Sequence, residues 1–186
     1  MRVQTLSLGS LWKVRLSARP TAVICSLLLW ALYSALGGFL FKLTPGVAIV
    51  GGFLALILHW FSELAHQFGH IWAGRQVGYA ATGIQLWWVF SSTLYPTDEP
   101  ALPTAVHLQR ALGGPALSLL LTILAATLCL ALLPAGGFVW RLAAVFALQN
   151  LLVFIIGLLP LGFTDGSTLL RLRGARPAQE RLGRNG

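Results

Sequence analysis

The chain has 186 residues, of which 56% are hydrophobic and only 10% are charged, and its mean hydropathy is +0.77. Soluble domains average about 25% charged residues, so this composition excludes an ordinary soluble protein and indicates an integral membrane protein. The net charge of +8 does not indicate a nucleic-acid partner, because the basic residues gather near the chain ends rather than in a patch interleaved with aromatic residues. Two separate cysteines in apolar segments predict neither a disulfide nor a thiolate metal site.

Four segments are long and apolar enough to cross a bilayer, which takes about 20 residues. They cover approximately residues 21–41, 47–70, 111–133 and 138–159. The predicted fold is therefore an all-α polytopic membrane protein with four transmembrane helices, forming one membrane domain over residues 21–170. Between the second and third helices, residues 83–90 are aromatic and β-prone, which predicts a short strand or hairpin at the membrane interface.

The distribution of lysine and arginine predicts the orientation in the membrane. Eleven of them fall before the first span, between the second and third spans, or after the fourth, and two fall on the other side. The positive-inside rule then places both termini in the cytoplasm. Residues 1–20 are expected to form a basic cytoplasmic N-terminus, and residues 171–186 a basic, disordered cytoplasmic tail.

The second span carries a stripe of polar residues that is unusual for a membrane helix. At 100° per residue, its members share one helical face: His59, Glu63, His66, Gln67 and His70. Two histidines at i and i+4 can reach one metal ion, and polar groups at this depth call for a functional reason. A third ligand could come from Asp165, after the fourth span. From spacing alone, the Asp165-Gly166 pair fits a turn equally well.

Three motifs in this order resemble the site-2 class of intramembrane metalloproteases. His66-Gln67-Phe68-Gly69-His70 is similar to the metal motif His-Glu-x-Gly-His of that class. Gly114-Pro115-Ala116-Leu117-Ser118 looks like its Gly-Pro-x-x-Asn segment, with serine for asparagine. The stretch from Gly157 through Pro160 to Asp165-Gly166 has the spacing of its Asn-x-x-Pro-x-x-x-x-Asp-Gly motif, with glycine for asparagine. The resemblance implies one zinc ion, with His66, His70 and Asp165 as its ligands.

The chain departs from this pattern at Gln67, where the class has the glutamate that acts as general base. A glutamine side chain can orient water or an oxyanion but cannot take up a proton. Glu63 lies one turn earlier on the same face, about 6 Å away along the axis. Glu63 and Gln67 are thus the candidate catalytic residues. Two other interpretations remain open: Glu63 as a fourth, shell-closing ligand, or a metal-free site in which His59 and Glu63 hydrogen-bond each other.

The expected function is that of a zinc metalloendopeptidase that hydrolyses peptide bonds of membrane-spanning substrates near the cytoplasmic face. Its partners would be the lipid bilayer and a transmembrane protein substrate. The alternative is a non-catalytic relative that binds metal or transmembrane helices without cleavage, as the replacement of glutamate by Gln67 suggests. A small carrier or proton relay would use the same polar stripe, but the order of the three motifs argues against it.

Overall fold

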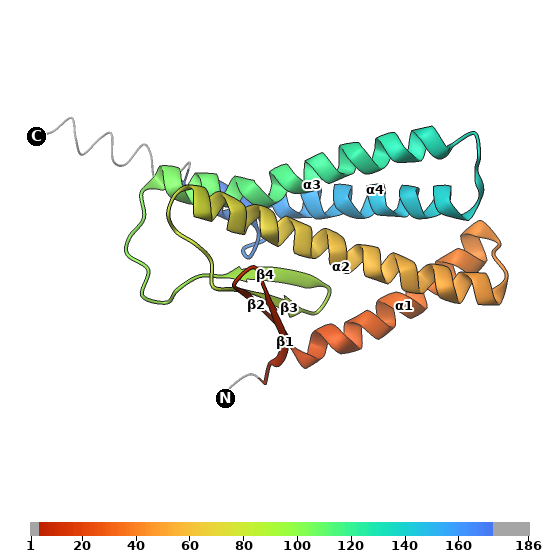
Figure 1. The fold of residues 1–186 in the computed structure, drawn as a ribbon, viewed down its shortest axis with the longest axis horizontal. Coiled ribbons are helices and arrows are strands. Elements are labelled where there is room, and N and C mark those ends of the chain that lie inside the picture. Colours follow the sequence, from red (N-terminus) through yellow and green to blue (C-terminus); the bar gives the residue numbers. More distant parts are fainter. Residues whose placement is uncertain (1–3, 173–186) are drawn as a thin grey trace, which may run out of the picture.

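A computed structural model describes residues 4–172 of the chain. Four helices dominate it: α1 (Pro20–Phe41), α2 (Pro45–Gln76), α3 (Thr104–Leu132) and α4 (Gly137–Leu158). All four are long and apolar enough to cross a membrane, so the chain is a multi-pass integral membrane protein and the predicted fold class is confirmed. Figure 1 shows α2 running through the middle of the bundle, with α3 and α4 on one side and α1 on the other.

Two helices are longer than the sequence predicts, at the ends that carry the polar motifs. α2 continues past His70 to Gln76, and α3 begins at Thr104 rather than near Ala111. Hydropathy detects only the apolar part of a helix that spans the lipid, whereas the helical hydrogen bonding of the backbone continues into the more polar turns beyond it. As a result, both His70 and Arg110 lie within helices rather than at their ends.

A pair of glycines allows α2 and α3 to approach closely. A Cβ atom on Gly69 of α2 would collide with the backbone of Gly113 in α3, and one on Gly113 would collide with Gly69. Such small-residue contacts are typical of membrane helix packing, where backbones meet without intervening side chains. This crossing brings the start of α3 directly against the histidine pair of α2.

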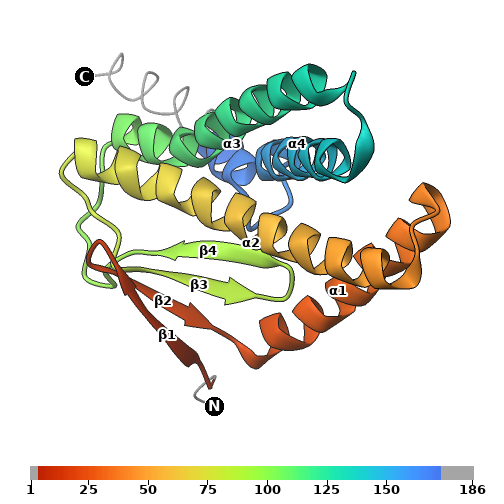
Figure 2. The same ribbon diagram turned by 45° about the vertical axis from the view of Figure 1, so that its right-hand side comes forward.

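A four-stranded sheet packs beside the C-terminal half of α2, away from α3 and α4 (Figure 2). Its order is β1 (Leu6–Leu11), β2 (Val14–Ala18), β3 (Gly83–Trp87) and β4 (Phe90–Leu94). Each hairpin is antiparallel, and β2 pairs with β3 in parallel. Val14 of β2 and Ile84 of β3 are fully buried against Ile71 of α2, so the two hairpins share one small apolar core with that helix.

The β3–β4 hairpin confirms the predicted strand or hairpin over residues 83–90, although β4 runs further, to Leu94. The N-terminal hairpin within residues 6–18 was not predicted. Its turn residues Trp12 and Lys13 both have positive φ, which a two-residue hairpin turn of this kind requires. Neither is a glycine, asparagine or aspartate, so the usual sequence signal for the turn is missing. Most of the predicted tail, from residue 173 on, lies outside the described residues.

Candidate metal centre

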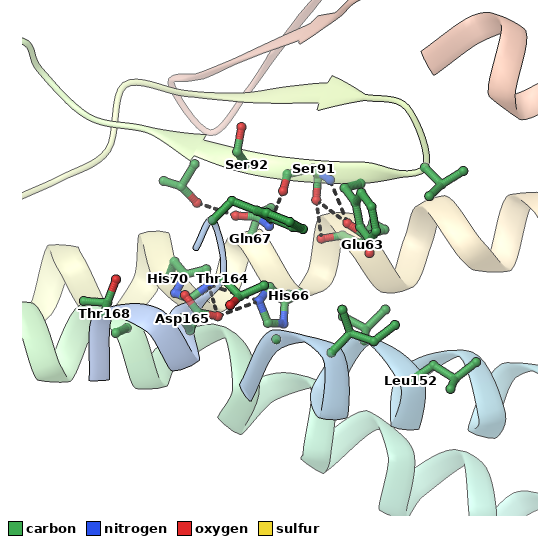
Figure 3. Close-up of a pocket in the computed structure, with 18 of the residues that line it drawn as sticks. Glu63, His66, Gln67, His70, Ser91, Ser92, Leu152, Thr164, Asp165 and Thr168 are labelled. Carbon is green, nitrogen blue, oxygen red and sulfur yellow. Dashed lines mark hydrogen bonds and ion pairs between the residues drawn. The ribbon is translucent and has the colours of Figure 1, made fainter. Parts of the chain in front are cut away.

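Three potential ligand atoms meet at one point between α2 and the segment after α4. The Nε2 atoms of His66 and His70 lie 3.1 Å apart. Oδ2 of Asp165 lies 3.1 Å from His66 Nε2 and 3.2 Å from His70 Nε2. Figure 3 shows the three side chains pointing toward one another. The structure therefore brings together all three residues that the sequence singled out as metal ligands, and it leaves their role as ligands a prediction.

The donor set fits a tetrahedral metal ion with an open position. Ligands at the zinc–nitrogen distance of about 2.0–2.1 Å lie about 3.3 Å apart in a tetrahedron, close to the separations seen here. Two imidazole nitrogens and one carboxylate oxygen are also a donor combination that zinc accepts. Among the described residues, no other His, Cys, Asp or Glu joins this group. Glu63 therefore does not complete a fourth ligand in this geometry.

Hydrogen bonds to the far side of each imidazole ring set which nitrogen faces the centre. His70 Nδ1 donates to the backbone carbonyl of Arg110 at 2.7 Å, since a carbonyl can only accept. His66 Nδ1 lies 2.9 Å from the hydroxyl oxygen of Ser118, a fully buried side chain of α3. When a metal ion is bound, Nδ1 of each ring would carry the proton and each Nε2 would be the lone-pair donor directed at the centre, as in metal-bound histidines generally.

Glycines make room for the ligands. A Cβ atom on Gly114 of α3 would collide with the Nε2 atoms of both His66 and His70. A Cβ on Gly157 of α4 would lie 3.2 Å from Cε1 of His66 and 3.7 Å from Oδ2 of Asp165. The space for the three ligand side chains therefore depends on two glycines, one in α3 and one in α4.

Asp165 lies after the end of α4, at the start of a short helical segment. Burial raises the pKa of its carboxyl group, but hydrogen bonds from His66 and His70 and the charge of these rings outweigh that effect. The pKa lies below its ordinary value as a result. The carboxylate is thus ionised at neutral pH, which is the form that a metal ligand requires.

The two candidate catalytic residues face strand β4 from the same helix. Oε2 of Glu63 accepts hydrogen bonds from the backbone N–H of Ser91 at 2.8 Å and from its hydroxyl group at 2.7 Å. Nε2 of Gln67 donates to the carbonyl of Ser91 at 3.1 Å, and Oε1 of Gln67 accepts from the Thr93 hydroxyl at 2.6 Å. Both side chains therefore bind the outward edge of β4 to α2 (Figure 3).

The remaining histidine of the polar stripe also contacts the hairpin. His59 Nε2 lies 3.0 Å from the carbonyl of Val89, at the β3–β4 turn. It therefore pairs with the hairpin, while Glu63 pairs with Ser91, and the two do not form the mutual hydrogen bond considered above. The polar stripe is distributed between the metal-ligand group and the strand, which is unlike a continuous relay across the membrane.

A cavity of about 620 Å³ joins these features, within the usual size range of ligand sites. Its walls come from α1, α2, β4, α4 and the start of α3. Glu63, His66, Gln67, His70 and Asp165 all line it.

Three further residues that line this cavity were not predicted from the sequence: Ser91, Tyr95 and Arg110. Nothing in their local sequence marks them, because they reach the cavity only through the sheet and the α2–α3 crossing.

Comparison with known proteins identifies a solved structure with the same fold. No family model matches the chain, and no curated protein matches its sequence. A solved structure, the Site-2 Protease from Methanocaldococcus jannaschii, matches with a TM-score of 0.68 over 93% of this chain and 73% of that chain, at 17% sequence identity. At this identity the likeness establishes the fold alone: the chain shares the fold of that site-2 protease.

Proposed function

We propose that this protein is a zinc-dependent intramembrane peptidase that hydrolyses peptide bonds of membrane-spanning substrates near the cytoplasmic face. The observation that carries the proposal is the triangle of His66 Nε2, His70 Nε2 and Asp165 Oδ2, with sides of 3.1–3.2 Å, beside a cavity walled by membrane helices. The site-2 protease fold supports it. The excess of lysine and arginine at both ends of the chain supports a cytoplasmic location of both termini.

His66, His70 and Asp165 would hold the zinc ion. Zinc bound there would supply Lewis acidity, polarising a peptide carbonyl and making a water molecule easier to deprotonate. Glu63 is the carboxylate of the same helix that lines the cavity, and we assign it the role of general base. Gln67 would orient the water or the substrate carbonyl through its amide group.

The contacts of Ser91 indicate how Glu63 becomes available. Glu63 and Gln67 bond the N–H and C=O of Ser91, which are the groups that an added strand would use. An extended substrate segment that pairs with β4 at Ser91 replaces both side chains, since strand addition uses main-chain hydrogen bonds. The carboxylate of Glu63 then keeps only the bond from the Ser91 hydroxyl and has open lone pairs to accept a proton from water. In this proposal, the base is released only when substrate occupies the strand edge.

A second candidate function is binding without cleavage. Gln67 stands where the site-2 class has its base, and Glu63 is held by two hydrogen bonds from Ser91. If those bonds persist when substrate is present, the protein binds metal or transmembrane helices and does not hydrolyse them. The two functions share the metal centre and differ in whether Glu63 takes up a proton.

Metal content tests the centre that both functions share. We expect about one zinc ion per chain in detergent-purified protein, lost in His66→Ala and Asp165→Asn. His59→Ala is the matched control, because His59 bonds the hairpin turn and is not part of the ligand group. Equal zinc in the wild type and His66→Ala would reject the metal centre.

Cleavage of a test transmembrane substrate separates the two functions. If Glu63 is the base, the wild type cleaves and Glu63→Gln loses at least about 100-fold in rate, the lower end of what general acid–base catalysis contributes. Zinc content should stay at the wild-type level in that variant. A zinc-loaded wild type that binds the substrate and leaves it intact would favour the non-catalytic function. Full activity in Glu63→Gln would reject Glu63 as the base.

A further inference from the structure

An ion pair between Arg110 of α3 and Glu99 of the segment before α3 lies in the wall of the cavity. Nη1 of Arg110 lies 2.8 Å from Oε1 of Glu99, and only 7% of the Arg110 side chain is exposed. The guanidinium carbon lies 3.4 Å from the centre of the Tyr95 ring. All three residues line the same cavity as the candidate metal ligands.

Contacts other than Glu99 hold Arg110 in place. Its backbone carbonyl accepts the hydrogen bond from His70 Nδ1 at 2.7 Å, so this turn of α3 is tied to the metal centre. Its aliphatic stem passes Gly74 of α2, where an added Cβ would lie 3.7 Å from Arg110 Cγ. Its guanidinium group stacks on Tyr95. The cation therefore keeps its position when the carboxylate beside it changes.

Glu99, in contrast, belongs to a segment without helix or strand between β4 and α3. Its side chain is 18% exposed, more than that of Arg110. Pro96, Pro100 and Pro103 break up any regular backbone hydrogen bonding in this segment. The carboxylate is thus the replaceable member of the pair, and the guanidinium group is the fixed one.

We propose that Arg110 and Tyr95 form a subsite for an acidic side chain of the substrate, which Glu99 occupies when no substrate is bound. A guanidinium group recognises a carboxylate through paired, charge-assisted hydrogen bonds, and a neutral amide cannot replace that charge. The inference rests on the proposed function, in either its cleaving or its binding form. It adds a substrate class: membrane-spanning segments with an Asp or Glu close to the reacting peptide bond.

The contact with Gly74 places the aliphatic stem of Arg110, which leads to this subsite, relative to the metal centre. Gly74 lies six residues beyond the middle of the His66–His70 pair, about 9 Å along α2 at 1.5 Å per residue. An extended segment advances about 3.3 Å per residue, so the acidic residue falls about three residues from the reacting bond. It lies on the side nearer the C-terminal end of α2. Under the proposed orientation, this is the cytoplasmic side.

Peptide binding to the full chain in detergent micelles tests the subsite. The probes are fluorescently labelled membrane-spanning peptides that carry one Glu, Gln or Lys at successive positions across the cytoplasmic boundary. At one position we expect the Glu peptide to bind about tenfold more tightly than the Gln peptide, as a charged hydrogen-bonded pair would give. The Lys peptide should bind more weakly than either. The measured quantity is the ratio of dissociation constants.

Glu99→Gln should increase that ratio further, because the competing carboxylate is gone while the new amide oxygen still accepts from Arg110. Asp98→Asn is the matched control: it removes the same charge one residue away, at an exposed position outside the cavity. Arg110→Gln should bring the ratio close to one. Retained zinc in that variant shows that the site is intact, since the backbone carbonyl of residue 110 still accepts from His70.

Equal binding of Glu and Gln peptides at every position would overturn the subsite. So would an equal effect of Glu99→Gln and Asp98→Asn, which would assign the preference to overall charge. Failure of all peptides to bind would instead count against the proposed function itself. The two failures are therefore distinguishable.

Discussion

Replacing Gly114 by alanine tests the metal centre without touching a ligand. The three atoms nearest to a Cβ at this position all belong to the imidazole rings of His66 and His70, and His66 Nε2 would lie only 2.6 Å away. Ordinary contact between such atoms needs about 3.5 Å, so a ring must move by about 1 Å. A zinc–nitrogen bond of about 2.0 Å tolerates about 0.2 Å. We therefore expect Gly114→Ala to lower zinc affinity by about 100-fold or more, beyond most substitutions that only perturb a ligand's support.

The assay is a chelator-competition titration of zinc on detergent-purified protein, with Gly157→Ala and Gly38→Ala for comparison. Gly157→Ala should have a smaller effect, because its Cβ would lie 3.2 Å from His66 Cε1. Gly38→Ala is the control for substitution within a helix, since nothing lies within 4 Å of its Cβ. Zinc affinity in Gly114→Ala equal to that in Gly38→Ala would refute the arrangement of the two imidazole nitrogens.

Three further predictions concern support of the centre, helix packing and the N-terminal hairpin. Ser118→Ala removes the hydrogen-bond partner of His66 Nδ1 and should weaken zinc binding by about tenfold in the same titration; unchanged affinity would show that Ser118 does not orient the ring. Gly69→Ala forces α2 away from Gly113 and should lower the free energy of unfolding in detergent by about 1–3 kcal/mol, whereas no loss would contradict the close crossing. Lys13→Gly relieves a positive φ of 66° and should raise the unfolding free energy by up to about 1 kcal/mol; a decrease would argue against this turn.

Local patterns in the sequence were enough to predict the four membrane helices and the polar stripe on the second of them. The four apolar segments follow from bilayer thickness, and the placement of His66 and His70 on one face follows from the helical period. The ends of these helices were less predictable. The extra turns of α2 and α3 are too polar to register as lipid-spanning, and those of α3 carry Arg110 to the cavity.

Contacts between distant segments were beyond the reach of these patterns. Whether Asp165 forms a turn or meets the histidines could not be decided from spacing, because the answer depends on how α4 packs against α2. The partner of Glu63 was unpredictable for a related reason: Ser91 reaches it only because β4 belongs to a sheet packed on that helix.

The sequence by itself determined what one helix or span can show: membrane residence, four crossings, and a polar stripe on one helix that includes Gln67. Only the tertiary structure decided that His66, His70 and Asp165 converge, that Ser91 holds Glu63, and that an unpredicted N-terminal hairpin completes the sheet. The physical reason is the separation along the chain over which each signal acts. Hydropathy and helical periodicity act over one element, whereas convergence depends on glycine-mediated helix crossing and on strand pairing between residues 68 positions apart, such as Ser17 with Gln85.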